Sequence, residues 1–168
     1  PGATSINPNG FPVSKIAIDT FTNATGQTAY ATIMGFTGGG GHVWKTVDAG
    51  AHWTDITGNL PDAPADSVAV DPGDPSIVYV GTDVGVFTTS NGGTTWDEYG
   101  TGLPNVAVVS MRVFDSGAHH ELRVGTHGRG IWSIDLASAL TPDFTVNITN
   151  PTLELPPGFT GQLTGKLI

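Results

Sequence analysis

A motif that recurs after 43 residues constrains the fold of this chain more than any other feature of its sequence. The first copy, Gly41–Trp53, reads GHVWKTVDAGAHW, and the second, Gly85–Trp96, reads GVFTTSNGGTTW, so that their closing tryptophans lie 43 positions apart. A weaker copy of the first half is Gly130–Asp135, GIWSID. Each full copy reads as a strand, a tight turn and the start of a return strand. A period of about 45 residues in strand-rich sequence indicates a β-propeller or a similar array of β-units.

The composition favours short strands joined by tight turns. The 168 residues include 24 Gly and 12 Pro, and only 12% are charged. No window of about a dozen residues shows a convincing helical period, whereas Gly and Pro are the residues that punctuate strands with turns. The length is enough for one domain with a real core. We therefore expect an all-β fold.

The charge balance excludes several classes of partner. With 15 acidic residues against 6 basic ones, the net charge is −9, which argues against nucleic acid and against an anionic membrane surface. The chain has no cysteine, so disulfides and thiolate metal sites are excluded. It also has no apolar run long enough to span a membrane. Because it begins at Pro1 without Met, we interpret it as a processed or trimmed product.

The chain divides into three repeating units and two flanking segments. Residues 1–13 are expected to form a loop that leads into the first strand, and the three units are expected over residues 14–57, 67–99 and 106–136. The strands predicted within the units are Ser14–Asp19, Thr28–Met34, His42–Val47 and Trp53–Thr57; Ser67–Asp71, Ile77–Thr82, Val86–Ser90 and Trp96–Tyr99; Val106–Phe114, Leu122–Thr126 and Ile131–Leu136. Residues 137–143 read as a linker, and residues 144–168 alternate like the first strands of a β-sandwich domain.

Three such units cannot close a ring, because propellers have four to eight blades. The third unit also lacks a closing strand with its turn and tryptophan. We therefore expect a partial propeller of about three four-stranded blades. The remaining blades are expected to come from the same parent protein or from another chain.

Two segments resemble a known turn motif. Thr46-x-Asp48-x-Gly50-x-x-Trp53 and Thr89-x-Asn91-x-Gly93-x-Thr95-Trp96 are similar to the Asp-box, which is also called the bacterial neuraminidase repeat. Propellers with this motif include sialidases, xyloglucan-degrading endoglucanases, sortilin-type receptors and photosystem assembly factors. The resemblance covers residues 14–136. It implies that each box lies in the hairpin between the third and fourth strands of a blade, away from the ligand face, and that its role is structural.

Each residue of the box has a physical reason to be there. The Asp or Asn side chain, Asp48 or Asn91, accepts backbone N–H groups across the tight turn. The glycine, Gly50 or Gly93, permits a positive φ that a Cβ would penalise. The tryptophan returns into the blade and covers its apolar end. His52 departs from the Thr that is usual at its position.

The order of strands predicts which loops share the ligand face. Successive hairpins of an antiparallel sheet alternate between its two ends. The loops between second and third strands should therefore converge, and these are Gly35–Gly41, Asp83–Gly85 and His127–Gly130. The connections between units, Leu60–Asp66 and Leu103–Asn105, should join them.

Three side chains on these loops are candidate ligand-face residues. Arg129 has the geometry to bind a carboxylate bidentately, and His127 and Asp83 are suited to acid–base work if their pKa values are tuned. The alternative is that His127 and Arg129 tie neighbouring blades together. His119 and His120 are adjacent and are predicted to be solvated. We assign no catalytic residue from the sequence.

A calcium site is the one cofactor that the sequence suggests. Asp71, Asp74 and Asp83 flank glycine-containing turns, and carboxylates with backbone carbonyls suit Ca²⁺. The alternative is that these aspartates cap their turns. No other cofactor is expected. Asn23 and Asn147 stand in N-glycosylation sequons, for which chance occurrence is the alternative.

Two main functions remain open at this point. The first is a non-catalytic fragment of a secreted or cell-surface propeller that binds glycan or protein as a scaffold. The alternative is the carboxy-terminal part of a glycoside hydrolase of the xyloglucanase or sialidase type. A sialidase needs three arginines around its substrate, and the only arginines here are Arg112, Arg123 and Arg129. A third possibility is an assembly factor or receptor that grips a protein across the same face.

Overall fold

The computed structural model describes residues 10–22, 25–117 and 119–136, which form eleven strands and no helix. The chain divides into two units, residues 1–138 and 139–168, and all the described residues belong to the first. The predicted linker and sandwich strands, together with the sequons at Asn23 and Asn147, lie outside the described residues. No helix of the described part is suited to crossing a membrane.

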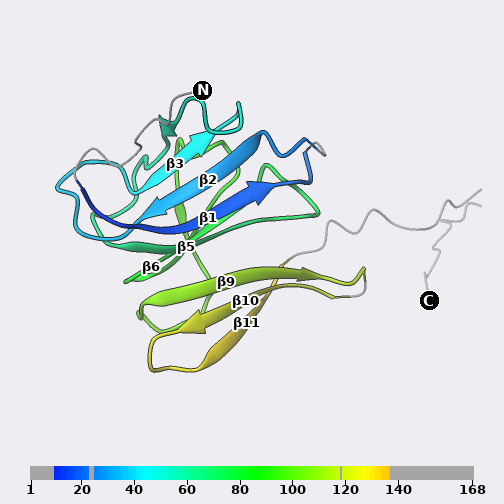
Figure 1. Ribbon diagram of the computed structural model, residues 1–168. Coiled ribbons are helices and arrows are strands. Elements are labelled where there is room, and N and C mark those ends of the chain that lie inside the picture. The colour runs from blue at the N-terminus through cyan, green and yellow to red at the C-terminus, as the bar shows by residue number, and fades with distance from the viewer. Residues whose placement is uncertain (1–9, 23–24, 118, 137–168) are drawn as a thin grey trace, which may run out of the picture. The chain divides into compact units, whose positions relative to one another are not determined.

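The strands form three antiparallel sheets in chain order, which we call blades 1, 2 and 3 (Figure 1). Blade 1 contains β1 (Val13–Asp19), β2 (Thr28–Ile33), β3 (Val43–Thr46) and β4 (Thr54–Asp55). Blade 2 contains β5 (Ala65–Val70), β6 (Val78–Thr82), β7 (Gly85–Thr89) and β8 (Asp97–Tyr99). Blade 3 contains β9 (Val108–Asp115), β10 (His120–Thr126) and β11 (Ile131–Asp135). The fold is thus all-β and has the blades of a partial propeller, as predicted.

Every strand predicted within the three units overlaps an observed strand, but the closing strands β4 and β8 are shorter than predicted. Trp53 and Trp96 belong to the turns that precede these strands. The N–H group of Trp96 donates to the side chain of Asn59 (2.6 Å) instead of to a neighbouring strand. The tryptophan therefore closes the turn before the sheet ladder resumes.

Blade 2 is covered on both faces, which explains its apolar strands. β5 packs against β1 and β2 of blade 1 and against β9 of blade 3. All five residues of β6 are buried, as is typical of a strand with neighbours on both faces. The core between blades 1 and 2 contains Tyr30, Val43, Ile56, Leu60, Ala65, Val68, Val70, Val78, Val80, Phe87 and Trp96. The core between blades 2 and 3 contains Ala69, Tyr79, Val86, Val108, Met111, Leu122, Val124 and Leu136.

Strand direction sorts the connections into two ends of the blades. One end, the loop end, carries the connections 34–42, 56–64, 83–84, 100–107 and 127–130. The opposite end, the turn end, carries among others the turns 47–53, 71–77 and 90–96. In Figure 1 the loop end of each blade lies on the left.

Candidate functional site

A bulge near the loop end recurs in the first strand of each blade, which is β1, β5 or β9. The pairing of β1 with β2, of β5 with β6 and of β9 with β10 shifts there by one residue. A bulge interrupts the alternation of a strand and re-aims a side chain. The residues that the pairing skips are Ser14, Asp66 and Val109. Blade 2 alone therefore carries an ionisable group at this position.

Asp66 forms an acidic pair with Asp83, one of the residues singled out in the sequence. Asp83 directly follows β6, and its N–H group donates to the carbonyl of Pro64 (3.1 Å), which holds the turn beside the start of β5. Partial burial, a hydrogen bond with the Asp83 side chain and its negative charge raise the pKa of Asp66 to about 6. Asp66 therefore keeps its proton at mildly acidic pH, because burial and a nearby like charge both disfavour its ionised form.

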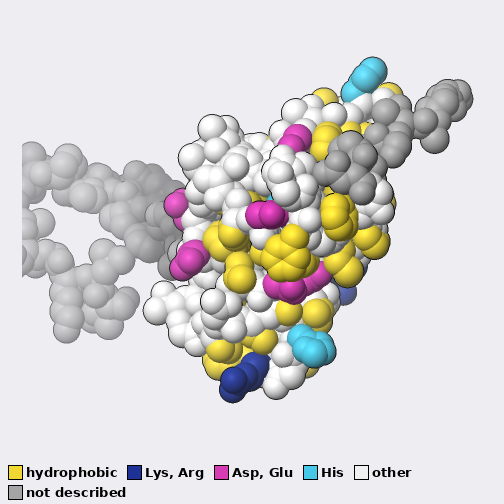
Figure 2. All heavy atoms as spheres, turned by 90° about the vertical axis from the view of Figure 1, so that its left-hand side faces the viewer, with side chains coloured by type: hydrophobic (Ala, Val, Ile, Leu, Met, Phe, Trp, Pro, Cys, Tyr) yellow, Lys and Arg dark blue, Asp and Glu magenta, His cyan; other side chains and the backbone are white. Residues whose placement is uncertain are grey.

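The surroundings of the pair are acidic and accessible. Figure 2 looks onto the loop end, where acidic side chains are spread over the middle of the face and the few basic ones lie at its margin. Asp83 is exposed and Asp66 is half-buried. A ligand that approaches this face therefore meets hydrogen-bond acceptors before it meets cations.

His127 and Arg129 also lie at the loop end, on the connection between β10 and β11. The N–H group of His127 donates to the carbonyl of Ala107 (2.9 Å), and the carbonyl of Arg129 accepts a hydrogen bond from Trp132 Nε1 (3.0 Å). Both side chains are exposed. In the described part of the chain, no hydrogen bond or ion pair joins either side chain to Asp66 or Asp83. The structure thus places the three candidates at one end without bringing them into contact.

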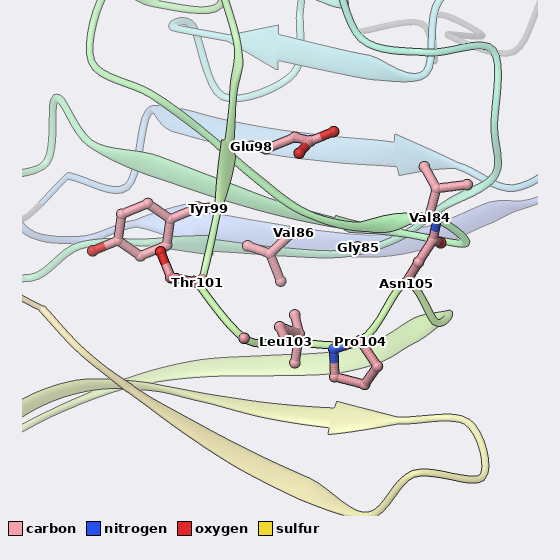
Figure 3. A pocket seen from close by; sticks show the side chains of 11 residues that line it. Val84, Gly85, Val86, Glu98, Tyr99, Thr101, Leu103, Pro104 and Asn105 are labelled. Carbon is pink, nitrogen blue, oxygen red and sulfur yellow. The ribbon is translucent and has the colours of Figure 1, made fainter.

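Two pockets at the loop end are related by the 43-residue repeat. The blade-1 pocket, about 340 Å³, is lined by residues 39–42, 55, 57, 58, 60 and 62. The blade-2 pocket, about 350 Å³, is lined by residues 84–86 and 98–105 and is shown in Figure 3. Both are lined by a leucine of the connection that leads to the next blade, Leu60 or Leu103, and by an acidic residue on the fourth strand, Asp55 or Glu98. The two pockets therefore occupy equivalent positions in the repeat.

The blade-1 pocket holds a buried histidine that the sequence analysis did not select. The side chain of His42 is 3% exposed, and its Nε2 lies 2.9 Å from Asp62 Oδ1. A carboxylate oxygen only accepts, so Nε2 carries the hydrogen. Burial opposes ionisation of Asp62, but hydrogen bonds from His42, Thr37 and Gly38 outweigh it and lower the pKa of Asp62. His42 Nδ1 is buried without a hydrogen-bond partner.

The two turns that resemble the Asp-box lie at the opposite, turn end. In the first, Asp48 Oδ1 accepts hydrogen bonds from the Thr46 hydroxyl (2.8 Å) and the His52 N–H group (2.9 Å), and Thr46 Oγ1 accepts one from the Gly50 N–H group (2.9 Å). His52 contributes in place of the usual Thr, since its Nδ1 lies 2.6 Å from Asp48 Oδ2.

The second turn repeats this pattern without the charge. Asn91 Oδ1 accepts from the Thr89 hydroxyl (2.9 Å) and the Thr95 N–H group (3.0 Å), and Thr89 Oγ1 accepts from the Gly93 N–H group (3.1 Å). Trp96 is buried, and its Nε1 donates to the carbonyl of Ile56 in blade 1 (2.9 Å). These contacts join the second turn to the connection 56–64 that leaves blade 1.

The candidate calcium ligands do not come together. Asp71 and Asp74 lie at the turn end, whereas Asp83 lies at the loop end, because β6 separates them. Asp74 Oδ1 accepts hydrogen bonds from both the N–H group and the hydroxyl of Ser76, as a turn-capping aspartate does. Within residues 10–22, 25–117 and 119–136, no three His, Asp or Glu side chains are grouped as metal ligands.

His120 corrects the prediction that both adjacent histidines are solvated. Its Nε2 lies 2.9 Å from Asp71 Oδ1, and Asp71 is fully buried. Asp71 Oδ1 also accepts the Gly73 N–H group (2.8 Å), and Asp71 Oδ2 accepts the Tyr79 hydroxyl (3.3 Å). The pairing joins blade 2 to blade 3. The two partners lie 49 residues apart in the sequence, so a local sequence pattern does not predict their contact.

Comparison with known proteins identifies similar folds. No protein-family model matches the chain, and no curated protein matches it. Among solved structures, the GH74 xyloglucanase from Xanthomonas campestris matches 71% of this chain with a TM-score of 0.53 and 17% identity, and the match covers 20% of that enzyme. The GH74 enzyme from Niastella koreensis matches 72% of the chain with a TM-score of 0.51 and 21% identity, over 21% of its length.

The chain therefore spans about a fifth of the length of these enzymes. At such identities the likeness establishes the fold, that of part of a propeller. Both neighbours are GH74 proteins.

Proposed function

We propose that this chain is part of a polysaccharide-degrading β-propeller of the glycoside-hydrolase type and that its loop end forms part of the glycan-binding face. The observation that carries the proposal is the acidic pair of Asp66 and Asp83, set by a bulge at the loop end, with the pKa of Asp66 raised to about 6. The fold likeness to two GH74 proteins, one of them a xyloglucanase, supports the choice of substrate class.

Two neighbouring carboxyl groups, of which Asp66 is protonated at mildly acidic pH, are chemically suited to sugar hydroxyls. The protonated oxygen donates a hydrogen bond, and the remaining oxygens accept. A vicinal diol offers the complementary set, because each hydroxyl both donates and accepts. Charge-assisted hydrogen bonds of this kind are roughly twice as strong as neutral ones. The pair therefore orients a neutral glycan without a cation.

The same geometry limits the catalytic role of the pair. Cleavage of a glycosidic bond uses two carboxyl groups about 5 to 9.5 Å apart, so that the sugar or a water fits between them. The Asp83 side chain is near enough to Asp66 to raise its pKa through hydrogen bonding and through its negative charge. We assign them together to substrate binding, or to one side of the scissile bond, and not to both catalytic roles.

Binding of xyloglucan oligosaccharides, followed by calorimetry at pH 5, tests this function. Asp83→Asn should weaken binding at least about tenfold, because a hydrogen bond to a charged group contributes about 1.5 kcal/mol or more. Asp66→Asn should weaken binding less, because an amide resembles the protonated side chain that Asp66 carries at pH 5. Asp97→Asn removes an equal charge on β8 and serves as the matched control. Sialylated oligosaccharides serve as the second ligand. Equal affinity of all three variants and the wild type would contradict the proposal, as would a preference for the sialylated ligand.

Three further assignments accompany this function. We assign the turns at residues 46–53 and 89–96 to the Asp-box, supported by their matching hydrogen bonds. We place the protein outside the cell, because polymeric glycans of this class are extracellular substrates. Its partners are the blades that would complete the ring. Mass measurement of the purified protein tests this last point, and a stably folded, monodisperse species of 17.3 kDa would contradict it.

A further inference from the structure

The two repeat-related pockets differ in one pair of residues. Where the blade-1 pocket has His42 and Asp62, the blade-2 pocket has Gly85 and Asn105 at the positions 43 residues later. Nearly all residues of β5, β6 and β7 in blade 2 are buried, so the fold of a blade does not require a histidine–aspartate pair there. The pair also carries a cost, since His42 Nδ1 is buried and unpartnered and such an atom loses its hydration without compensation. The blade-2 pocket lacks this unfavourable pair, so its presence in the blade-1 pocket points to a function.

The pair positions the wall of the blade-1 pocket. Asp62 accepts hydrogen bonds from His42 Nε2 (2.9 Å) and from the N–H groups of Thr37 (2.9 Å) and Gly38 (3.2 Å). It thereby fixes the glycine-rich connection between β2 and β3 against the connection that leads to blade 2. The Asp62 side chain is still 46% exposed, so part of its carboxylate faces outward. His42 is a positioning residue in this arrangement.

Asp55 supplies a second carboxylate in the same pocket. Its Oδ1 accepts the N–H group of Thr57 (2.9 Å). Gly41 leaves room for it, since a Cβ at residue 41 would lie about 2.4 Å from the Asp55 carboxylate. Leu60 contributes a buried apolar surface to the lining. The pocket thus offers two oriented carboxylates beside an apolar patch, in a volume of about 340 Å³.

We infer that the blade-1 pocket binds one sugar unit of a neutral glycan, with ring hydroxyls donating to Asp55 and Asp62 and a ring face resting on Leu60. This inference rests on the proposed function and adds a second contact region to it. A sugar ring presents hydroxyls at its edge and C–H groups on its faces, which matches the lining. A metal ion does not fit, because no third His, Asp or Glu ligand is grouped with a pair in the described residues. An organic ammonium ion does not fit either, because the pocket lining contains none of the aromatic side chains that form a cage around such ligands.

The pocket lies close in the chain to the acidic pair. Asp62 and Asp66 are four residues apart, on the connection between blades 1 and 2 and at the start of β5. The pocket and the acidic pair therefore lie at the same end of the blades, next to one connection.

Oligosaccharide titration with observation of backbone amides by NMR tests the inference. Asp55→Asn retains the acceptor for Thr57 and replaces only the other oxygen, so it should fold normally and weaken binding of a xyloglucan oligosaccharide at least about tenfold. Glu98→Gln makes the same change in the blade-2 pocket and should leave affinity unchanged within about twofold. The amide signals of Gly39–Gly41 should shift on binding in the wild type.

A second set of variants tests the positioning role of His42. His42→Gln retains a side-chain N–H donor and should keep most of the affinity, whereas His42→Ala should lose it while thermal unfolding shows that the fold persists. Unchanged affinity of Asp55→Asn, with Asp83→Asn still weakening binding, would overturn the pocket and leave the proposed function standing. No binding by the wild type would overturn both. Binding of putrescine in place of the oligosaccharide would replace the sugar with an ammonium ligand and overturn the inference.

Discussion

At the scale of single residues, an aspartate at the end of the first strand of each blade caps the turn that follows. Asp19 Oδ1 accepts the N–H groups of Phe21 (2.8 Å) and Thr22 (3.0 Å), Asp71 Oδ1 that of Gly73 (2.8 Å), and Asp115 Oδ1 that of Gly117 (2.8 Å). Each satisfies donors in the turn that leaves the strand. An aspartate thus caps this turn in all three blades. Asp71 in blade 2 also pairs with His120 of blade 3 and so links these two blades.

Asp66 is the residue whose ionisation should appear in the stability of the protein. Its pKa in the fold is about 6, above the ordinary value near 4, so the folded state binds a proton more tightly than the unfolded chain. The unfolding free energy should therefore fall as pH rises from about 4 to about 6. Asp66→Asn should flatten this slope, and urea unfolding at several pH values measures it. The same slope in the variant and the wild type would assign the titration to another group.

Local turn chemistry was readable from the sequence, whereas contacts between segments far apart in the chain were not. Thr46, Asp48 and Gly50 lie within five positions, and their hydrogen bonds depend only on the turn itself. Asp66 meets Asp83, and His42 meets Asp62, over about twenty residues, through the pairing of strands and the packing of blades. A sequence pattern shows which end of a blade a loop occupies, because antiparallel strands alternate in direction. It does not show where a bulge redirects a side chain, which is why Asp66 was missed.

At the scale of elements, the first turn depends on the acceptor at residue 48 more than on its charge. Hydrogen bonds from the His52 N–H group, the His52 ring and the Thr46 hydroxyl lower the pKa of Asp48 to about 2. Because Asn91 makes the same turn in blade 2, Asp48→Asn should change the melting temperature little at pH 7, whereas Asp48→Ala should lower it clearly. Acidification from pH 4 to pH 2 should destabilise the wild type more than Asp48→Asn. Scanning calorimetry of the three proteins provides both comparisons, and equal melting temperatures for the Asn and Ala variants would contradict this account.

The closing tryptophans differ in what they cover. Trp96 is 2% exposed and belongs to the core between blades 1 and 2, where Asn59 binds both its N–H group (2.6 Å) and its carbonyl (2.9 Å). Trp53 is only half-buried. Trp96→Ala should cost about 3–5 kcal/mol, as removal of a buried aromatic side chain does, and Trp53→Ala markedly less. Urea denaturation of both variants measures the difference, and equal losses would show that the core between the blades is not where Trp96 contributes.

At the scale of the whole described part, close approach between blades depends on small residues. Gly81 and Gly125 occupy the same place in the sequence pattern of their blades, before the threonine that ends β6 or β10. Gly81 lies under blade 3, where Ser67 Oγ donates to the carbonyl of Val108 (2.8 Å). A Cβ at Gly81 would lie 2.4 Å from Ser67 Oγ and 2.8 Å from the Val108 carbonyl oxygen. A Cβ at Gly125 would meet only Ser110, at 3.6 Å.

This contrast makes a matched pair of substitutions a test of how blades 2 and 3 pack. Gly81→Ala must push β9 away from β6 or distort the Ser67 contact, and overpacking of this kind costs about 1–3 kcal/mol. Gly125→Ala introduces an ordinary contact in a strand and should be neutral or stabilising by up to about 1 kcal/mol, since it reduces the freedom of the unfolded chain. Chemical denaturation measures both, and hydrogen exchange of the β9 amides shows whether the loss is local to the interface. If the two variants were equally stable, the blades would not pack as closely through Gly81 as the structure requires.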